Sequence, residues 1–330
     1  ISYATASGDV VSLYFHAQTH LLSKLETLTS HSLFGDVVVE TAFTGYAQLG
    51  GVQLPTGQVN KRGGALTLEV AFSHHTVEPL PDAAFAPPAG FVPAPQPSAA
   101  EPAVRELAEN VYLIEGLGGG AYRVLFVALR DFVLVVEAPV NEAVSGQAIR
   151  LIKETVGGKP IHFIVPTHHH DDHAGGIRAF SNEGAIILTT EGNARYFVRA
   201  ALAKFTVQPD RLARSGRQFV SSSQILDTVI DGKAVVQNGG RTVEIYDIGP
   251  GPHAEEMLVV WLPEEKILFQ GDLFNRGSDG ALRPANETTI HFSQWLKKSG
   301  LPVQRLIGVH SQESTMADLE ASLQMAAGPQ

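Results

Sequence analysis

The sequence predicts an α/β (α+β) fold class, with a smaller antiparallel β domain followed by a larger domain in which strands alternate with helices. Three observations indicate this. Alternating apolar and polar residues, separated by turn signals, fill the first quarter of the chain. A stretch rich in proline and alanine follows it. After that stretch, short apolar runs alternate with segments of helical periodicity.

Composition narrows the function classes. The chain has 330 residues, of which 44% are hydrophobic, so it can bury more than one core and two domains are expected. Its formal net charge is −10, without a cluster of Lys and Arg, which disfavours nucleic acid as a partner. There is no cysteine, and this excludes disulfides, thiol nucleophiles and Cys-containing zinc sites. The sequence does not indicate an oligomeric state.

The apolar runs bear on location. None approaches the roughly 20 residues that a membrane-spanning helix needs, so no membrane span is predicted. The chain begins at Ile1 rather than Met, as a mature form after signal-peptide removal or a trimmed sequence would. On the first interpretation an exported, periplasmic location is expected, and on the second a cytoplasmic one.

Residues 1–83 are predicted to form the β domain. The alternation is clearest over residues 66–73, with sequence LTLEVAFS, and predicts a half-buried antiparallel meander. Residues 84–103 are predicted to be a linker, because proline and alanine favour extended backbone with few hydrogen bonds. The alternative is an ordered extended arm that lies across the second domain.

Residues 104–330 are predicted to form the catalytic domain. The expected strands are residues 111–114, 122–129, 132–136, 161–166, 186–188, 234–236, 243–246, 257–262 and 266–269. The expected helices are residues 141–156, 193–204, 293–298 and 317–325. The sequence Asn238-Gly239-Gly240 predicts a hairpin turn. The strand at 161–166 ends at a cluster of histidines, and active sites of α/β folds lie at such strand ends.

This cluster is the segment His168-His169-His170-Asp171-Asp172-His173. Four imidazoles and two carboxylates in six residues require a cation to balance them. Nitrogen and oxygen donors suit zinc, and also iron or manganese. A solvated polar loop or a tag-like remnant is the alternative. The internal position, between an apolar strand and Gly175-Gly176, argues against both.

The spacing His-x-His-x-Asp-His resembles the signature of the metallo-β-lactamase superfamily. Three further positions match that family's pattern, each beside an apolar strand: His253, Asp272 and His310. The resemblance covers roughly Val104 to the C-terminus. It implies an αββα sandwich of two facing mixed sheets with helices outside.

The resemblance also implies two divalent metal ions, most readily Zn²⁺. It assigns His168, His170 and His253 to one ion, and Asp172, His173 and His310 to the other. Asp272 would bridge the two ions together with a hydroxide. A bound dication lowers the pKa of water from 15.7 to about 7, and this supplies a nucleophile at neutral pH. Asp172 is also the predicted catalytic residue, because it can take a proton from the nucleophile or pass it to the leaving group.

Four residues are predicted to line the substrate site: His169, Tyr196, Asn275 and Arg276. The glycine-rich segment 116–120 is interpreted as a hairpin over the mouth of the site, since no Lys-Ser/Thr follows it to favour a phosphate loop.

The chain departs from the family pattern at three positions. Glu137 replaces a common Asp, Ala254 a frequent Thr, and Val309 a common Gly. The carboxylate contact expected beneath the site is therefore in question at Glu137.

The first domain more loosely resembles the curved sheets of outer-membrane lipoprotein-sorting proteins, through residues 15–22 and 50–55. This resemblance implies an exported bacterial protein, with a sheet that packs on the catalytic domain or shapes its substrate channel.

The expected function is hydrolysis of an ester, a lactone or a related acyl bond in a small molecule. The absence of cysteine and the presence of Asp272 disfavour β-lactamase activity, which stays an alternative together with phosphodiesterase or phosphotriesterase activity. A second alternative is an iron-dependent, persulfide-type oxygenase, because related family members use a similar ligand set. A third is a non-enzymatic carrier protein.

Overall fold

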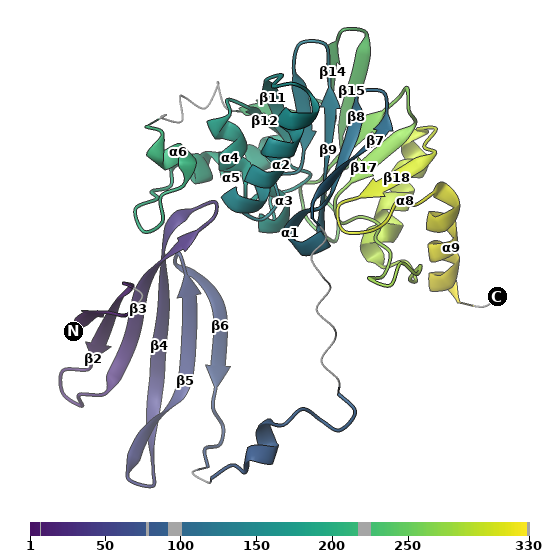
Figure 1. Ribbon diagram of the computed structural model, residues 1–330. Helices are drawn as coiled ribbons and strands as arrows, with labels where there is room; N and C mark the ends of the chain where they lie inside the picture. The colour runs from purple at the N-terminus through teal and green to yellow at the C-terminus, as the bar shows by residue number, and fades with distance from the viewer. Residues whose placement is uncertain (7, 77–78, 92–100, 217–225, 329–330) are drawn as a thin grey trace. The chain divides into compact units, whose positions relative to one another are not determined.

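The computed structural model describes residues 1–6, 8–76, 79–91, 101–216 and 226–328. The chain divides into two compact units (Figure 1). The first comprises residues 1–97 and 204–208, and the second comprises residues 98–203 and 209–330. The domain boundaries drawn from the sequence stay predictions, and residues 92–100 of the expected linker lie outside the described residues.

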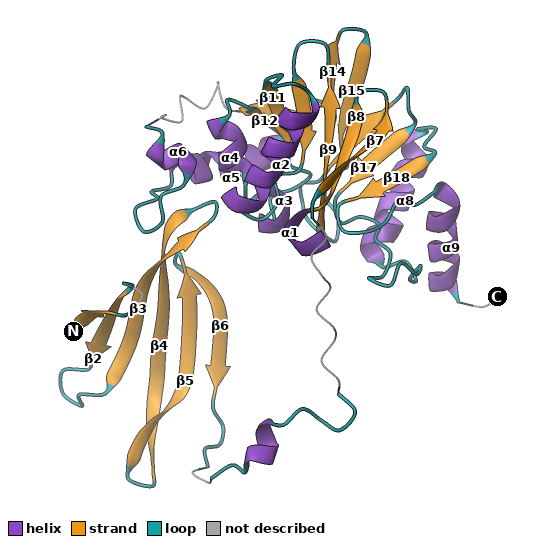
Figure 2. Cartoon of the chain, in the orientation of Figure 1, coloured by secondary structure: helices purple, strands orange, loops and turns teal. Residues whose placement is uncertain are grey.

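The first unit is built on a six-stranded antiparallel sheet, as expected from the alternating pattern. Figure 2 shows its strands side by side in chain order. They are β1 (Ser2–Ala4), β2 (Val10–Phe15), β3 (Leu22–His31), β4 (Gly35–Leu49), β5 (Val52–Arg62) and β6 (Ala65–Ala71). A short 3₁₀ helix, η1 (Asp82–Phe85), follows the sheet.

The expected half-burial is wrong for β6. Leu66 is 59% exposed and Leu68 is 49% exposed. Alternation correctly predicts that Leu66 and Leu68 lie on the same face of the sheet, because they are two residues apart on one strand. It does not predict whether other parts of the chain cover that face.

The second segment of the first unit, residues 204–208, is held by Asp36. The Asp36 carboxylate accepts hydrogen bonds from the Thr206 backbone N–H at 2.9 Å, the Thr206 hydroxyl at 2.6 Å and the Val207 N–H at 2.9 Å. The Asp36 N–H donates to the Lys204 carbonyl at 2.7 Å. Gly35 permits this approach, since a Cβ there would lie 1.9 Å from the Lys204 oxygen.

The second unit contains two mixed sheets. One has seven strands in the order β13-β12-β11-β10-β9-β8-β7, and the other has five in the order β14-β15-β16-β17-β18. The seven are β7 (Ala103–Ala108), β8 (Val111–Gly116), β9 (Tyr122–Ala128), β10 (Val133–Val136), β11 (Ile161–Val165), β12 (Ile186–Thr189) and β13 (Leu226–Thr228). The five are β14 (Lys233–Asn238), β15 (Arg241–Asp247), β16 (Leu258–Leu262), β17 (Ile267–Gln270) and β18 (Arg305–Gly308). The hairpin expected at Asn238-Gly239-Gly240 joins β14 to β15.

The helices lie outside the sheets. They are α1 (Leu117–Gly120), α2 (Glu142–Thr155), α3 (Asp171–Ala174), α4 (Ile177–Asn182), α5 (Glu191–Leu202), α6 (Arg211–Arg214), α8 (Glu287–Ser299) and α9 (Met316–Ala327). The four helices expected from periodicity correspond to α2, α5, α8 and α9. Asn141 fixes the start of α2, because its side-chain oxygen accepts from Ala143 N at 2.9 Å and Val144 N at 3.1 Å. Among the described residues, no helix has the length and apolarity to cross a membrane.

Packing of β16 shows why its apolar run is continuous. Leu258 and Val260 face the core between the two sheets, where they meet Val136 and Val165 of the seven-stranded sheet. Val259 faces the other way, into a second core formed with α8 and α9. A strand covered on both faces needs apolar side chains at every position. The unit is thus the expected αββα sandwich.

Candidate metal centre

The histidine segment lies at the C-terminal end of β11, as its sequence position predicts. His168 and His170 follow the strand, and α3 then carries Asp172 and His173. The glycines after α3 allow the chain to turn against its neighbours. A Cβ on Gly175 would lie 2.1 Å from the Val140 carbonyl oxygen, so this position has no room for a side chain.

The five-stranded sheet supplies the other three candidate ligands. His253 lies in the loop between β15 and β16, Asp272 follows β17 by two residues, and His310 follows β18 by two residues. Strands β17 and β18 are parallel neighbours, and therefore they bring Asp272 and His310 to the same edge. The site is assembled where the strands of both sheets end.

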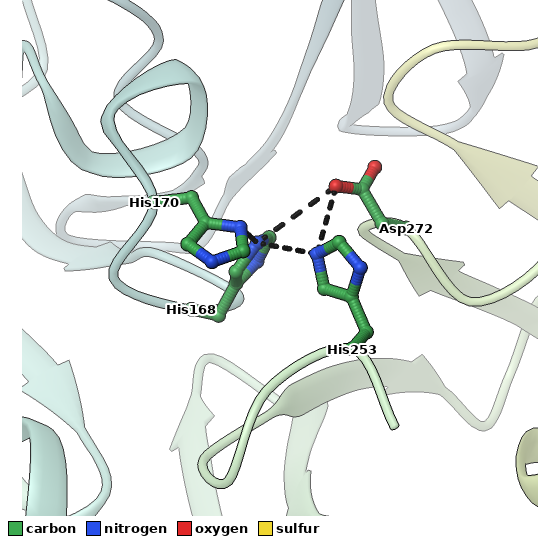
Figure 3. A group of neighbouring side chains, drawn as sticks. All are labelled: His168, His170, His253 and Asp272. Carbon is green, nitrogen blue, oxygen red and sulfur yellow. Dashed lines mark hydrogen bonds and ion pairs between the residues drawn. The ribbon is translucent and has the colours of Figure 1, made fainter. Parts of the chain in front are cut away.

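Four of these side chains form a first group, shown in Figure 3: His168, His170, His253 and Asp272. His168 Nε2 lies 2.8 Å from His170 Nδ1 and 3.1 Å from His253 Nε2. Asp272 Oδ2 lies 3.2 Å from His253 Nε2 and 3.8 Å from His168 Nε2. Their ligand atoms converge on one point.

A second group contains Asp172, His173, His310 and again Asp272. His173 Nε2 lies 3.2 Å from Asp272 Oδ2 and 3.4 Å from Asp172 Oδ2. His310 Nε2 lies 3.1 Å from Asp272 Oδ1 and 3.1 Å from His173 Nε2. Asp272 belongs to both groups, so its carboxylate joins them.

These spacings fit metal coordination. Tetrahedral zinc with bonds of about 2.0–2.1 Å separates adjacent ligand atoms by roughly 3.3 Å. The distances given above lie between 2.8 and 3.8 Å, and all ligand atoms of each group lie within 4.8 Å of one another. Asp272 Oδ1 is buried, and its contact at 3.1 Å is with the ring of His310, itself a candidate ligand, so a cation could bind between them. The donor set and its spacing therefore suit two divalent ions.

Electrostatics favour a cation as well. Burial is the main cause that lowers the pKa of His168 to about 2, so its ring is neutral and can ligate. Burial would raise the pKa of Asp272, but hydrogen bonds from His173 and His310 hold it well below its usual range. Hydrogen bonds from the same two histidines hold the pKa of Asp172 low. Both carboxylates are ionised at neutral pH.

Three of the imidazoles are oriented by a contact at their Nδ1 atom. Glu137 Oε2 accepts from His173 Nδ1 at 3.2 Å, and the Ala121 carbonyl accepts from His310 Nδ1 at 3.0 Å. Thr167 Oγ1 lies 3.2 Å from His168 Nδ1. Such contacts fix the tautomer and direct the other ring nitrogen toward a metal. Although Glu137 departs from the family's Asp, it preserves the carboxylate contact.

Sequence reasoning missed two of these partners, Ala121 and Thr167. Ala121 acts through its backbone carbonyl, so its side chain carries no signal. Thr167 directly precedes the histidine segment, and a buried hydroxyl beside a ligand was the signal that could have found it.

The four predicted substrate residues lie in different settings. The His169 ring packs against the Tyr196 ring at 5.0 Å between centroids, and burial raises the pKa of Tyr196 to about 12. The buried Asn275 Oδ1 finds no donor among the described residues. Their role in substrate binding stays a prediction.

Arg276 makes several contacts within the protein. Its guanidinium bonds to Ser314 Oγ at 3.0 Å, to the Gly280 carbonyl at 3.1 Å and to Asp318 at 2.8 Å. These contacts tie the loop after Asp272 to α9 and its preceding turn. Arg276 thus has a structural role, and its role in substrate binding stays a prediction.

The fold and the paired His/Asp groups define a metal-binding αββα sandwich. The family model of the metallo-beta-lactamase superfamily matches residues 104–310. The metallo-beta-lactamase type 2 of Bacteroides fragilis is 25% identical over 174 residues, which cover 51% of this chain and 61% of that protein. The enzyme of the same name from Elizabethkingia meningoseptica is 27% identical over 134 residues, covering 41% and 45%. The chain thus spans less than two thirds of either relative.

Solved structures share the fold. A metallo-beta-lactamase from Pontibacter korlensis aligns with a TM-score of 0.52 at 19% identity, covering 69% of this chain and 100% of that one. The metallo-beta-lactamase FIM-1 from Pseudomonas aeruginosa, in its mono-zinc form, aligns with a TM-score of 0.51 at 22% identity, covering 71% and 98%.

The chain belongs to the metallo-beta-lactamase superfamily, and its two groups of His and Asp side chains could each hold a metal ion. The family match begins at residue 104. The resemblance of the first unit to lipoprotein-sorting proteins stays a prediction.

Proposed function

We propose that the protein hydrolyses an ester or lactone bond in a small molecule at a centre that holds two divalent metal ions. The carboxylate of Asp272 carries this proposal, because it lies 3.2 Å from His253 of one group and 3.2 Å from His173 of the other. One side chain shared by two groups suits a pair of adjacent ions.

The ligands divide as the family pattern implies: His168, His170 and His253 for one ion, Asp172, His173 and His310 for the other, and Asp272 for both. When bound, the ions would supply a bridging hydroxide as nucleophile and polarise the scissile carbonyl. Zinc suits this donor set best, while iron and manganese also accept imidazole and carboxylate. The mono-zinc form of the FIM-1 relative supports zinc.

Asp172 is proposed to handle protons. Its side chain is 40% exposed, whereas that of Asp272 is 15% exposed, so Asp172 is the more open of the two carboxylates to a substrate and to water. A carboxylate that the nucleophile and water can reach can accept a proton. It can then return that proton to the leaving group.

The test begins with metal content. The full chain, purified without chelator, is analysed for zinc, iron and manganese, and is then assayed on aryl esters, lactones, phosphodiesters and β-lactams. We expect two equivalents of metal and hydrolysis of an ester or lactone. Asp272→Asn keeps the size of the side chain but removes its negative charge and one of its two ligand oxygens, so both metal content and turnover should fall. A wild-type chain that binds two metals but hydrolyses no acyl bond contradicts the proposal.

A second candidate is β-lactam hydrolysis, which the names of the relatives favour. Against it, this chain has no cysteine to serve as a metal ligand. A chromogenic cephalosporin in the same screen separates the candidates: turnover of that compound far above the turnover of lactones would replace the first proposal.

Other outcomes would point to the remaining alternatives. Thiol-dependent oxygen uptake by an iron-loaded chain, without ester turnover, would indicate a persulfide-type oxygenase. Faster turnover of phosphodiesters or phosphotriesters than of esters would indicate a phosphoesterase. Metal binding without any turnover would favour a carrier protein.

A further inference from the structure

Ala121 and the first two residues of β9 contact the segment that carries His310. The Ala121 carbonyl accepts a hydrogen bond from His310 Nδ1 at 3.0 Å. The Tyr122 ring meets the His310 imidazole edge-on, with 5.3 Å between ring centroids and an interplanar angle of 69°. Arg123 Nη1 donates to the Val309 carbonyl at 3.5 Å. This strand end therefore borders His310 on several sides.

The turn that leads into β9 is fixed by its own contacts. Leu117 is fully buried and forms an isolated antiparallel bridge with Tyr122. Arg123 also pairs with Glu115 of β8 at 3.3 Å between Nε and Oε1. The position of Tyr122 is thus determined from both strands of the hairpin, which is the hairpin expected from the glycine-rich sequence.

Gly118 is the point of closest approach in this turn. A Cβ on Gly118 would lie 2.5 Å from Cδ2 and 2.8 Å from Cε2 of the Tyr122 ring. Its neighbour Gly119 has a similar left-handed backbone, with φ +76° against +58°, yet a Cβ there would meet nothing within 4 Å. The two glycines share one backbone requirement, but only Gly118 makes room for the ring.

We infer that Tyr122 is a positioning residue for the second metal ion, because its ring contact holds the imidazole of His310 in place. The absence of a side chain at Gly118 makes room for the Tyr122 ring. This inference rests on the proposed two-metal function, and it predicts which of the two ions depends on the hairpin. His168, His170 and His253 have no contact with Tyr122 among the interactions of the described residues. Metal affinity of the first group should therefore not depend on the hairpin.

The experiment compares Gly118→Ala with Gly119→Ala in the full chain. Both substitutions place a side chain on left-handed backbone, so both carry the same conformational strain. Only Gly118→Ala displaces the ring. The metal-free proteins are titrated with Zn²⁺ against a chromophoric chelator, and with Co²⁺ while its visible absorption is followed. Thermal unfolding by circular dichroism reports whether each variant folds.

We expect Gly118→Ala to lower the affinity for the second equivalent of metal about 10- to 100-fold, the range seen when a contact to a metal ligand is removed. The first equivalent should bind as in the wild type, and Gly119→Ala should match the wild type in both. Tyr122→Leu should reproduce the Gly118→Ala result, and it keeps the test available if Gly118→Ala fails to fold. Tyr122→Phe should bind both equivalents normally, because it keeps the ring.

Equal effects of Gly118→Ala and Gly119→Ala on the second equivalent would overturn the inference, since strain alone would then explain them. A loss in Tyr122→Phe as large as in Tyr122→Leu would also overturn it, because the hydroxyl would be responsible. A wild-type chain that binds one equivalent only would instead contradict the two-metal proposal itself, and with it this inference.

Discussion

The side chain of Glu137 offers a sharp test of how the protein holds its second group of ligands. Glu137 is fully buried, Oε2 lies 3.2 Å from His173 Nδ1, and Oε1 accepts from the Thr167 N–H at 3.3 Å. The change Glu137→Asp restores the residue common in the family but removes one methylene. Without other movement, the carboxylate withdraws by about 1.5 Å, the length of one carbon–carbon bond.

The magnitude follows from these distances. A withdrawal of that size lengthens both contacts to roughly 4.5 Å, beyond hydrogen-bonding range. His173 then loses the partner that sets its tautomer, and the affinity for the second metal equivalent should fall about 10- to 100-fold. The buried carboxylate also loses its donors, which should cost about 1–3 kcal/mol of unfolding free energy. Backbone strain should not add to this, because Glu137 has φ +83° and Asp accepts positive φ more readily than Glu.

Metal titration and urea unfolding measure the two effects in the same variants. Glu137→Gln is the matched control for length, because it keeps both reach and volume and can still accept from Thr167. It should preserve most of the stability while it lowers second-metal affinity through loss of charge. If Glu137→Asp binds both equivalents as tightly as the wild type, then the longer side chain is not what orients His173, and the reasoning is refuted.

Three other predictions concern residues away from the ligands. Asp210→Ala should lower the free energy of unfolding, measured in urea, by about 3–5 kcal/mol, because it removes the ion pair with the buried guanidinium of Arg178. Asp210→Asn should lower it less, since the amide oxygen can still cap α6. Burial would raise the pKa of Asp36, but hydrogen bonds from Thr206 and Val207 lower it, so its contribution to stability is present above pH 4 and is lost as the pH falls below the unfolded value of 3.8. The melting temperatures of wild type and Asp36→Asn should accordingly differ at pH 7 and converge near pH 2. Arg276→Ala should lower the melting temperature, because it removes the ion pair with Asp318. A selective rise in KM for the best substrate would in addition support its predicted substrate role.

The sequence predicted the elements that carry local signals. The apolar run before the histidine segment identified β11, and Asn141 marked the start of α2. The short helices α3 and α4 were missed, because four to six residues are too few to show a helical period. The candidate ligands were chosen because their order matches the family motif and each stands beside an apolar strand, and the structure brings their side chains into two groups.

Features that depend on side-chain reach could not be predicted. Glu137 was expected to put its carboxylate contact in doubt, yet its extra methylene and its positive φ together bring the carboxylate to His173. Arg276 has the charge of a substrate ligand, and the structure pairs its guanidinium with Asp318. Neither contact can be predicted from residue type or spacing, because both depend on where the end of a side chain lies in the folded protein.

The geometry of the metal centre also depends on how the core of the second unit is packed. Histidines from the end of β11 belong to the seven-stranded sheet, whereas His253, Asp272 and His310 belong to the five-stranded sheet. Distances of 3.1–3.2 Å between ligand atoms of the two sheets therefore require the sheets to be packed in one relative position. Val165 of β11 and Phe269 of β17, each a few residues before a ligand, are both buried in the core between the sheets. Because close-packed cores resist small shifts, the apolar residues that give no chemical signal determine the geometry of the residues that do.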